Sequence, residues 1–128
     1  MNWSLDARVP VILVQSEDAM AEALRAGPSA VLAAGELPAR PMVGAVAALS
    51  FEVFSSHAVA CACCGGRSPA AQALDRLFQA RVRGTVAWFD RVVALVPGEA
   101  ARDMVEGALR DDAVSAARFR MEPVAQAG

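Results

Sequence analysis

The chain alternates short, uninterrupted apolar runs with stretches that have the spacing of amphipathic helices. Val9–Val14 is rich in β-branched residues and contains no charge, which is typical of a strand buried on both faces of a parallel sheet. Ala30–Ala33 and Val92–Val96 have the same character. Because parallel strands need long crossover connections, which helices supply, this alternation predicts βαβ units and a mostly parallel sheet covered by helices.

The helices are predicted from apolar spacing and from residues that suit helix ends. Ser16 is suited to cap a helix that ends at Gly27-Pro28. The strongest pattern covers Pro69–Arg83, which Ser68 is suited to cap and Gly84 to end. Its apolar stripe consists of Ala73, Leu74, Leu77, Phe78 and Val82. Two further helices are predicted, one after Gly98 and a short one from Asp112, its cap, through Phe119.

The stretch from Met42 to Phe54 fits two structures. Its apolar spacing fits a helix, whereas Phe51–Phe54 by itself fits an edge strand. Ala58–Cys61 is predicted to be the third strand. Together these elements predict a single three-layer α/β domain over residues 1–128, with a mostly parallel sheet of about four or five strands and flanking helices.

Charge and hydropathy argue against several classes of partner. The net charge is −2 and all twelve basic residues are arginine, so no excess of basic charge favours nucleic acid or an anionic membrane. Met1–Arg8 lacks the features of a signal peptide, and no apolar run approaches the roughly 20 residues that span a bilayer. We therefore expect a cytoplasmic protein with reduced thiols and without nucleic-acid or membrane partners.

Cysteine occurs only as Cys61, Cys63 and Cys64, and the single histidine, His57, stands four residues upstream. These are the side chains that ligate zinc readily through sulfur or nitrogen. In an extended strand Cys61 and Cys63 project to the same face, and Gly65-Gly66 would allow a turn that brings Cys64 to them. At the carboxyl end of a parallel strand, this cluster predicts a metal site with His57 as the fourth ligand. Zn²⁺ is the first choice, and Co²⁺ or another soft or borderline metal is an alternative.

Other interpretations of the same residues stay open. The cysteines could pack as small apolar side chains while His57 is solvated. They could instead act in redox chemistry, where one thiolate attacks and a neighbour resolves the product. A disulfide between adjacent cysteines is strained, and a reducing compartment disfavours it further. A purely structural interaction domain is a third alternative.

The C-x-C-C stretch at residues 61–64, followed by a polar turn and a leucine-bearing helix, resembles the metal-binding motif of the CobW-like metallochaperone GTPases. In that family the cysteines bind zinc, cobalt or a related ion, and GTP hydrolysis drives delivery of the metal. Phe89–Val93 is similar to the strand before the family's E-T-[TS]-G-x-A-x-P segment, with Gly98 and Ala100 at its glycine and alanine. The resemblance covers about residues 9–122 and implies a domain similar to the phosphate-loop NTPases.

The nucleotide-binding motifs of that family are missing. A phosphate loop needs G-x-x-x-x-G-K-[ST], but Gln15–Glu22 contains neither glycine nor lysine and carries three carboxylates. Leu95 stands at the family's glutamate position, where it can neither hold Mg²⁺ nor orient water. The chain therefore resembles a degenerate, truncated phosphate-loop NTPase domain that binds no nucleotide.

We accordingly expect a non-enzymatic metal-binding protein, an accessory or trafficking factor in metal homeostasis that passes its metal to a client protein. Three thiolates leave one position of a tetrahedral zinc site for His57, for water or for a residue of a partner chain. A homodimer that shares the metal is a variant of this hypothesis.

Overall fold

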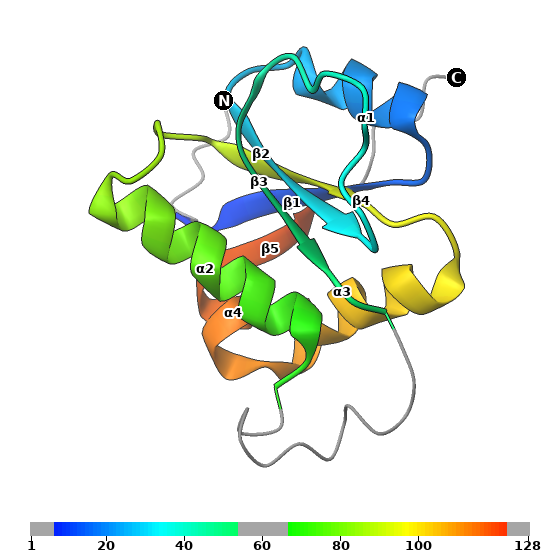
Figure 1. Cartoon of the computed structure of the whole chain (residues 1–128). Helices are drawn as coiled ribbons and strands as arrows, with labels where there is room; N and C mark the ends of the chain where they lie inside the picture. Colours follow the sequence, from blue (N-terminus) through cyan, green and yellow to red (C-terminus); the bar gives the residue numbers. More distant parts are fainter. Residues whose placement is uncertain (1–6, 54–66, 123–128) are drawn as a thin grey trace, which may run out of the picture.

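The computed structural model describes residues 7–53 and 67–122, and its centre is a five-stranded sheet whose strands all pair in parallel (Figure 1). The strands, in chain order, are β1 Val9–Val14, β2 Ser29–Ala34, β3 Ala45–Phe51, β4 Arg91–Leu95 and β5 Phe119–Glu122. Their spatial order is β3-β2-β4-β1-β5, so β3 and β5 form the two edges. The predicted parallel α/β sheet is confirmed.

Helices cover both faces of the sheet and make the three layers that the sequence predicts. Of the described helices, α1 Glu17–Leu24 alone packs on one face. α2 Pro69–Arg83, α3 Glu99–Asp111 and α4 Ala113–Arg118 lie on the other face (Figure 1). No helix in residues 7–53 and 67–122 combines the length and apolarity that crossing a membrane requires.

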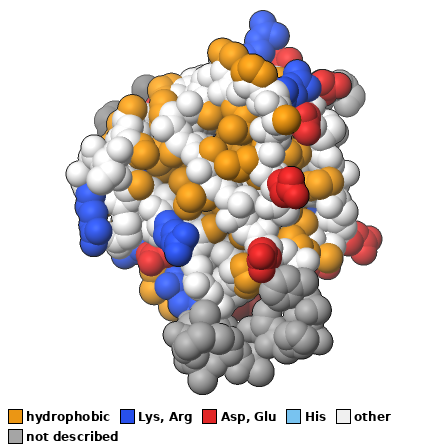
Figure 2. Space-filling model, in the orientation of Figure 1, with side chains coloured by type: hydrophobic (Ala, Val, Ile, Leu, Met, Phe, Trp, Pro, Cys, Tyr) orange, Lys and Arg blue, Asp and Glu red, His pale blue; other side chains and the backbone are white. Residues whose placement is uncertain are grey.

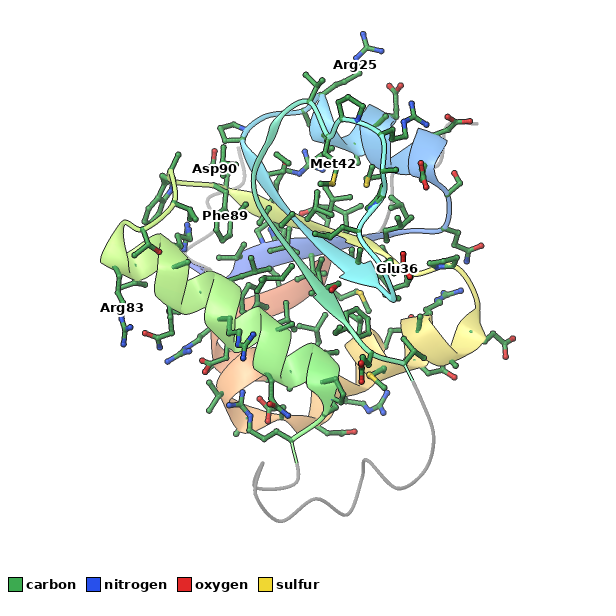
Figure 3. The ribbon with its side chains drawn as sticks, viewed as in Figure 1. Arg25, Glu36, Met42, Arg83, Phe89 and Asp90 are labelled. Atoms are coloured by element: carbon green, nitrogen blue, oxygen red, sulfur yellow. The ribbon has the colours of Figure 1, made fainter. Side chains whose placement is uncertain are left out.

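Strand side chains alternate between two apolar cores because successive residues point to opposite faces. Val11 belongs to the larger core together with Leu74 of α2, and Ile12 belongs to the smaller core together with Met20 of α1. Phe89, just before β4, is fully buried in the larger core. The next residue, Asp90, is exposed, and its backbone N–H donates to the Pro28 carbonyl at 3.0 Å (Figure 3).

The helix ends confirm the predicted roles of Ser16, Ser68 and Gly84 and correct the predicted end of α1. Ser16 and Ser68 each accept a hydrogen bond from a backbone N–H in the first turn of α1 and α2. Gly84 ends α2 in the left-handed conformation, with φ of 75°. However, α1 ends at Leu24, before the predicted Gly27-Pro28 stop, because the next N–H groups bond three residues back and tighten the last turn.

Two segments differ from the prediction in their secondary structure. Residues 45–51 form strand β3, so the helical interpretation of Met42–Phe54 is wrong and the strand lies earlier than Phe51–Phe54. Pairing with β2 determines the strand structure of this segment, because the parallel ladder satisfies backbone N–H and C=O groups of both strands. Phe119 likewise begins β5, opposite Val9, rather than ending the preceding helix. The predicted strand Ala58–Cys61 lies outside the described residues.

The end of α2 also departs from the predicted apolar stripe. Val82 is 60% exposed, although Leu74 and Leu77 on the same stripe are buried. Trp88 is 58% exposed, and the Arg81 guanidinium carbon lies 3.6 Å from the centre of a Trp88 ring. Arg81 also donates to the Phe89 carbonyl at 2.8 Å, so this arginine ties the end of α2 to the chain that enters β4.

Candidate functional site

The predicted metal ligands Cys61, Cys63, Cys64 and His57 all lie outside the described residues. The structure fixes the chain on both sides of them. It places Val53 just after β3 and Arg67 just before α2 (Figure 1). The candidate site is therefore built from these two anchor points, which we call the entry and the exit of the cysteine segment, residues 54–66.

The entry lies at the carboxyl end of the parallel strands. Phe51, the last residue of β3, is 4% exposed and lies opposite Ala34 of β2. Its carbonyl accepts a hydrogen bond of 2.8 Å from the Gly35 N–H. Ligand sites in open parallel sheets gather at the carboxyl ends of the strands, and the described chain that leads to the cysteine segment leaves the sheet at this end.

The exit is held by a two-point ion pair. Arg67 donates from Nε and Nη2 to the two carboxylate oxygens of Asp112, each at 3.0 Å. The carbonyl of Arg67 in turn accepts from Gln72 Nε2 at 3.0 Å. The side chains of Arg67 and Asp112 are 28% and 17% exposed, so water screens this pair less than a surface ion pair. Arg67 is therefore a paired, partly buried residue and not a solvated loop arginine.

Asp112 serves two structures at once. Its Oδ2 accepts from the N–H and from the hydroxyl of Ser115, each at 2.9 Å, and thereby caps α4. The hydrogen bond from Arg67 is the largest cause that lowers the pKa of Asp112 to about 2, and the Ser115 bonds act in the same direction. The same hydrogen bond raises the pKa of Arg67. The exit is thus tied to the start of α4 by charge and by capping.

A second acidic residue extends this cluster. Asp75 of α2 lies 3.8 Å from Arg67 and accepts a short hydrogen bond from Arg118 at the end of α4. The Arg118 guanidinium also lies 4.5 Å from the centre of the Phe78 ring. The cluster contains equal numbers of acidic and basic residues, so its formal charges balance: Arg67, Arg118, Asp75 and Asp112. Sequence reasoning missed it because Arg67 and Asp112 are 45 residues apart, and no local pattern pairs them.

Two hollows flank the first turn of α2. One, of about 350 Å³, lies between the end of β3 and α2 and includes Glu52 and Arg76 in its lining. The other, of about 390 Å³, lies between the start of α2 and α3 and includes Asp103 and Met104. The surface around both anchor points is therefore recessed and partly polar rather than filled by the apolar core.

The β1–α1 turn lies at the same end of the strands, but it is short and carries carboxylates. Ser16 Oγ accepts from the Ala19 N–H at 3.1 Å, and Glu17 and Asp18 occupy the first turn of α1. Asp18 lies 3.2 Å from Arg40. Carboxylates suit the positive end of a helix, but they occupy the place where a phosphate would otherwise bind. Leu95 is 6% exposed and packs in the smaller core, so it contributes to apolar packing.

No group of three histidine, cysteine, aspartate or glutamate side chains in residues 7–53 and 67–122 is arranged to hold a metal ion. Comparison with known proteins adds no assignment, since no family model, no curated protein and no solved structure matches the chain. The chemistry of this chain's own residues is therefore the basis for its proposed function.

Proposed function

We propose that this protein binds a metal ion, preferably Zn²⁺, through Cys61, Cys63 and Cys64, and that it acts as a non-enzymatic accessory or trafficking factor. His57, a water molecule or a residue of a partner chain completes the four-coordinate shell. The observation that carries the proposal is the confinement of every cysteine and the only histidine to the segment between Val53 and Arg67.

The two anchor points support this role. A metal site gains affinity when the ends of the ligand-bearing segment are already fixed, because less conformational entropy is lost on binding. Phe51 is fixed by strand pairing and burial, and Arg67 is fixed by the Asp112 carboxylate. The recessed surface beside α2 leaves space next to both anchors. An incomplete thiolate shell would also permit transfer of the ion to a client protein.

The proposal assigns no GTP chemistry to the protein. The β1–α1 turn is closed by Ser16 and carries Glu17 and Asp18 where a phosphate loop would present glycine and lysine. Leu95 cannot bind Mg²⁺. Metal release would therefore depend on the affinity of the receiving partner and not on nucleotide hydrolysis.

Elemental analysis of protein purified without a metal-affinity tag tests the proposal. We expect about one zinc or cobalt ion per chain in the wild type, and none in the Cys61→Ser/Cys63→Ser/Cys64→Ser variant. The His57→Ala variant should keep the metal with lower affinity if His57 is the fourth ligand. Added Zn²⁺ should also raise the melting temperature of the wild type but not that of the triple variant, because the metal binds the folded state more tightly than the unfolded chain.

The contradicting result is equally definite. If the wild type carries no metal and takes up no more than the triple serine variant, the metal proposal fails. Fast alkylation of one thiol in metal-saturated protein would instead favour a redox protein, because bound thiolates are protected from such reagents. Unchanged folding and partner binding after all three cysteines are replaced would favour a structural interaction domain.

A further inference from the structure

The two edges of the sheet are built differently. β5 has four residues and carries Arg120 and Glu122, whose side chains form an ion pair of 3.2 Å. β3 has seven residues, Ala45–Phe51, and contains no charged residue, no proline and no glycine. Short strands and charged side chains protect a sheet edge from pairing with another chain. By this criterion the β5 edge is protected and the β3 edge is open to a further strand.

The surroundings of β3 are also apolar. Within the part of the chain that the structure describes, β2 is the one strand that pairs with β3, so the outer backbone of β3 faces no described strand. In the loop that leads to β3, Val43 is 83% exposed and Leu37 is 40% exposed. Figure 2 shows hydrophobic side chains gathered on the front of the molecule, where β3 lies in Figure 1. Met42 of the same loop packs against the smaller core, toward α1 (Figure 3).

We propose that β3 pairs with β3 of a second copy of this chain, in antiparallel orientation, and so joins the two five-stranded sheets into one. Identical edges that pair around a twofold axis are antiparallel and close after two copies. Pairing of β3 with β5 of the next copy would instead be head-to-tail and open-ended, and the charged, four-residue β5 disfavours it. The contrast between the edges thus selects a dimer over a fibre.

The sequence of β3 fits this pairing. With the twofold axis at its midpoint, Ala48 lies opposite Ala48 of the other copy. The remaining opposite pairs are Ala47 with Leu49, Val46 with Ser50, and Ala45 with Phe51. Each of these remaining pairs joins a smaller side chain with a larger one, and no pair in the strand sets like charges against each other. The strand is therefore complementary to itself in size and in charge.

This dimer does not depend on the metal proposal. Because the strands run in opposite directions, the two Phe51 residues lie at opposite ends of the paired strands, about 20 Å apart at ~3.4 Å per residue. Each cysteine segment then begins at its own end of the dimer. This arrangement favours one metal per chain over a single ion shared on the twofold axis.

The mass of the triple serine variant in solution, measured by sedimentation over a range of concentrations, tests the dimer without interference from the thiols. We expect the mass of two chains. Ala48→Lys and Ala48→Glu each place like charges directly opposite on the axis and should give one chain, whereas an equal mixture of the two should again give two chains. A triple serine variant that is monomeric would overturn the proposal, and this is the result expected if another protein or residues 54–66 cover β3. A dimer that neither Ala48 substitution disturbs would also overturn it.

Ala48 is half-buried, so a charge there could also impair folding, which circular dichroism would reveal. A second pair of variants covers that case. In the triple serine background, Ala48→Cys should form an intermolecular disulfide on mild oxidation, because the two sulfurs face each other across the axis. Val43→Cys, which is more exposed but lies away from the axis, should not. Equal cross-linking of both variants would contradict the proposed register.

Discussion

The β1–α1 and β3–α2 connections both join a strand to a helix at the carboxyl end of the parallel strands, and they differ in length and in chemistry. The β1–α1 turn consists of Gln15 and Ser16, and the Ser16 cap closes it directly onto the carboxylates of α1. The β3–α2 connection runs from Glu52 to Ser68 and contains every cysteine and the histidine. The short turn fixes a helix and disfavours anions, whereas the long connection carries the proposed metal ligands between two anchored ends. Under the proposed function, the capacity to bind a metal ion is concentrated in this one connection.

The largest expected effect tests the cores on which the two connections rest. Leu74→Ala on α2 and Met20→Ala on α1 each remove a side chain that is at most 1% exposed, and each should cost about 2–5 kcal/mol of unfolding free energy. Leu74→Ala should be the more costly of the two, because leucine packs in a defined shape while methionine adapts to its surroundings. Urea unfolding of both variants measures the difference. A greater loss for Met20→Ala would contradict this ranking.

The next effect concerns the exit of the cysteine segment. Asp112→Ala removes the partner of Arg67 and the cap of α4, and should cost about 2–3 kcal/mol. Asp112→Asn keeps one acceptor oxygen that can cap α4 but loses the charge and the second acceptor of the pair with Arg67, so it should cost about 1–2 kcal/mol after allowance for solvent screening. Urea unfolding at pH 7 measures both losses.

The contribution of Asp112 should also depend on pH. Its pKa is lowered from 3.8 to about 2 in the folded state, so the carboxylate stabilises the fold fully above the unfolded pKa. This stabilisation is lost as the pH falls from about 4 to about 2. The difference between wild type and Asp112→Asn should therefore shrink over that interval. A difference that stays constant down to pH 2 would show that the Arg67–Asp112 pair does not stabilise the fold.

A smaller effect compares the two serine caps. Ser16→Ala and Ser68→Ala should each lower the unfolding free energy by about 1 kcal/mol. Only Ser68 lies at the exit of the cysteine segment, so only Ser68→Ala should weaken Zn²⁺ binding, by at most about fivefold. Competition with a chromogenic chelator measures the affinity of both variants. An equal loss of affinity in both would show that the two connections are not functionally distinct.

The smallest expected effect is that of nucleotide. Addition of GTP and Mg²⁺ should leave the melting temperature unchanged and produce no heat of binding, because Glu17 and Asp18 occupy the start of α1. Isothermal calorimetry with the wild type measures this directly. Binding at micromolar affinity would show that the β1–α1 turn accepts phosphates after all.

The fold was largely predictable because its elements carry strong local patterns. Val9–Val14 became β1 with the predicted bounds, and Pro69–Arg83 became α2 with the predicted cap. β3 was harder to predict, because its alanine-rich sequence fits helical spacing and pairing with β2 decides its structure. Phe119–Glu122 is short, and it is a strand because it lies beside β1. Such long-range pairing leaves no local pattern in the sequence.

The sequence points to the proposed ligands but not to the residues that anchor the segment carrying them. Cys61, Cys63 and Cys64 attract attention by residue type and spacing alone. The Arg67–Asp112 pair depends on the way α2 and α4 pack, and a two-point ion pair between residues this far apart in sequence emerges only from the fold.

X-ray absorption spectroscopy of the zinc-loaded wild type tests the central claim most directly, because it reports the atoms bound to the metal. We predict a shell of three sulfur atoms at ~2.3 Å and one nitrogen or oxygen atom at ~2.0–2.1 Å. A shell of nitrogen and oxygen atoms alone, with no sulfur, would contradict the assignment of the cysteines as ligands.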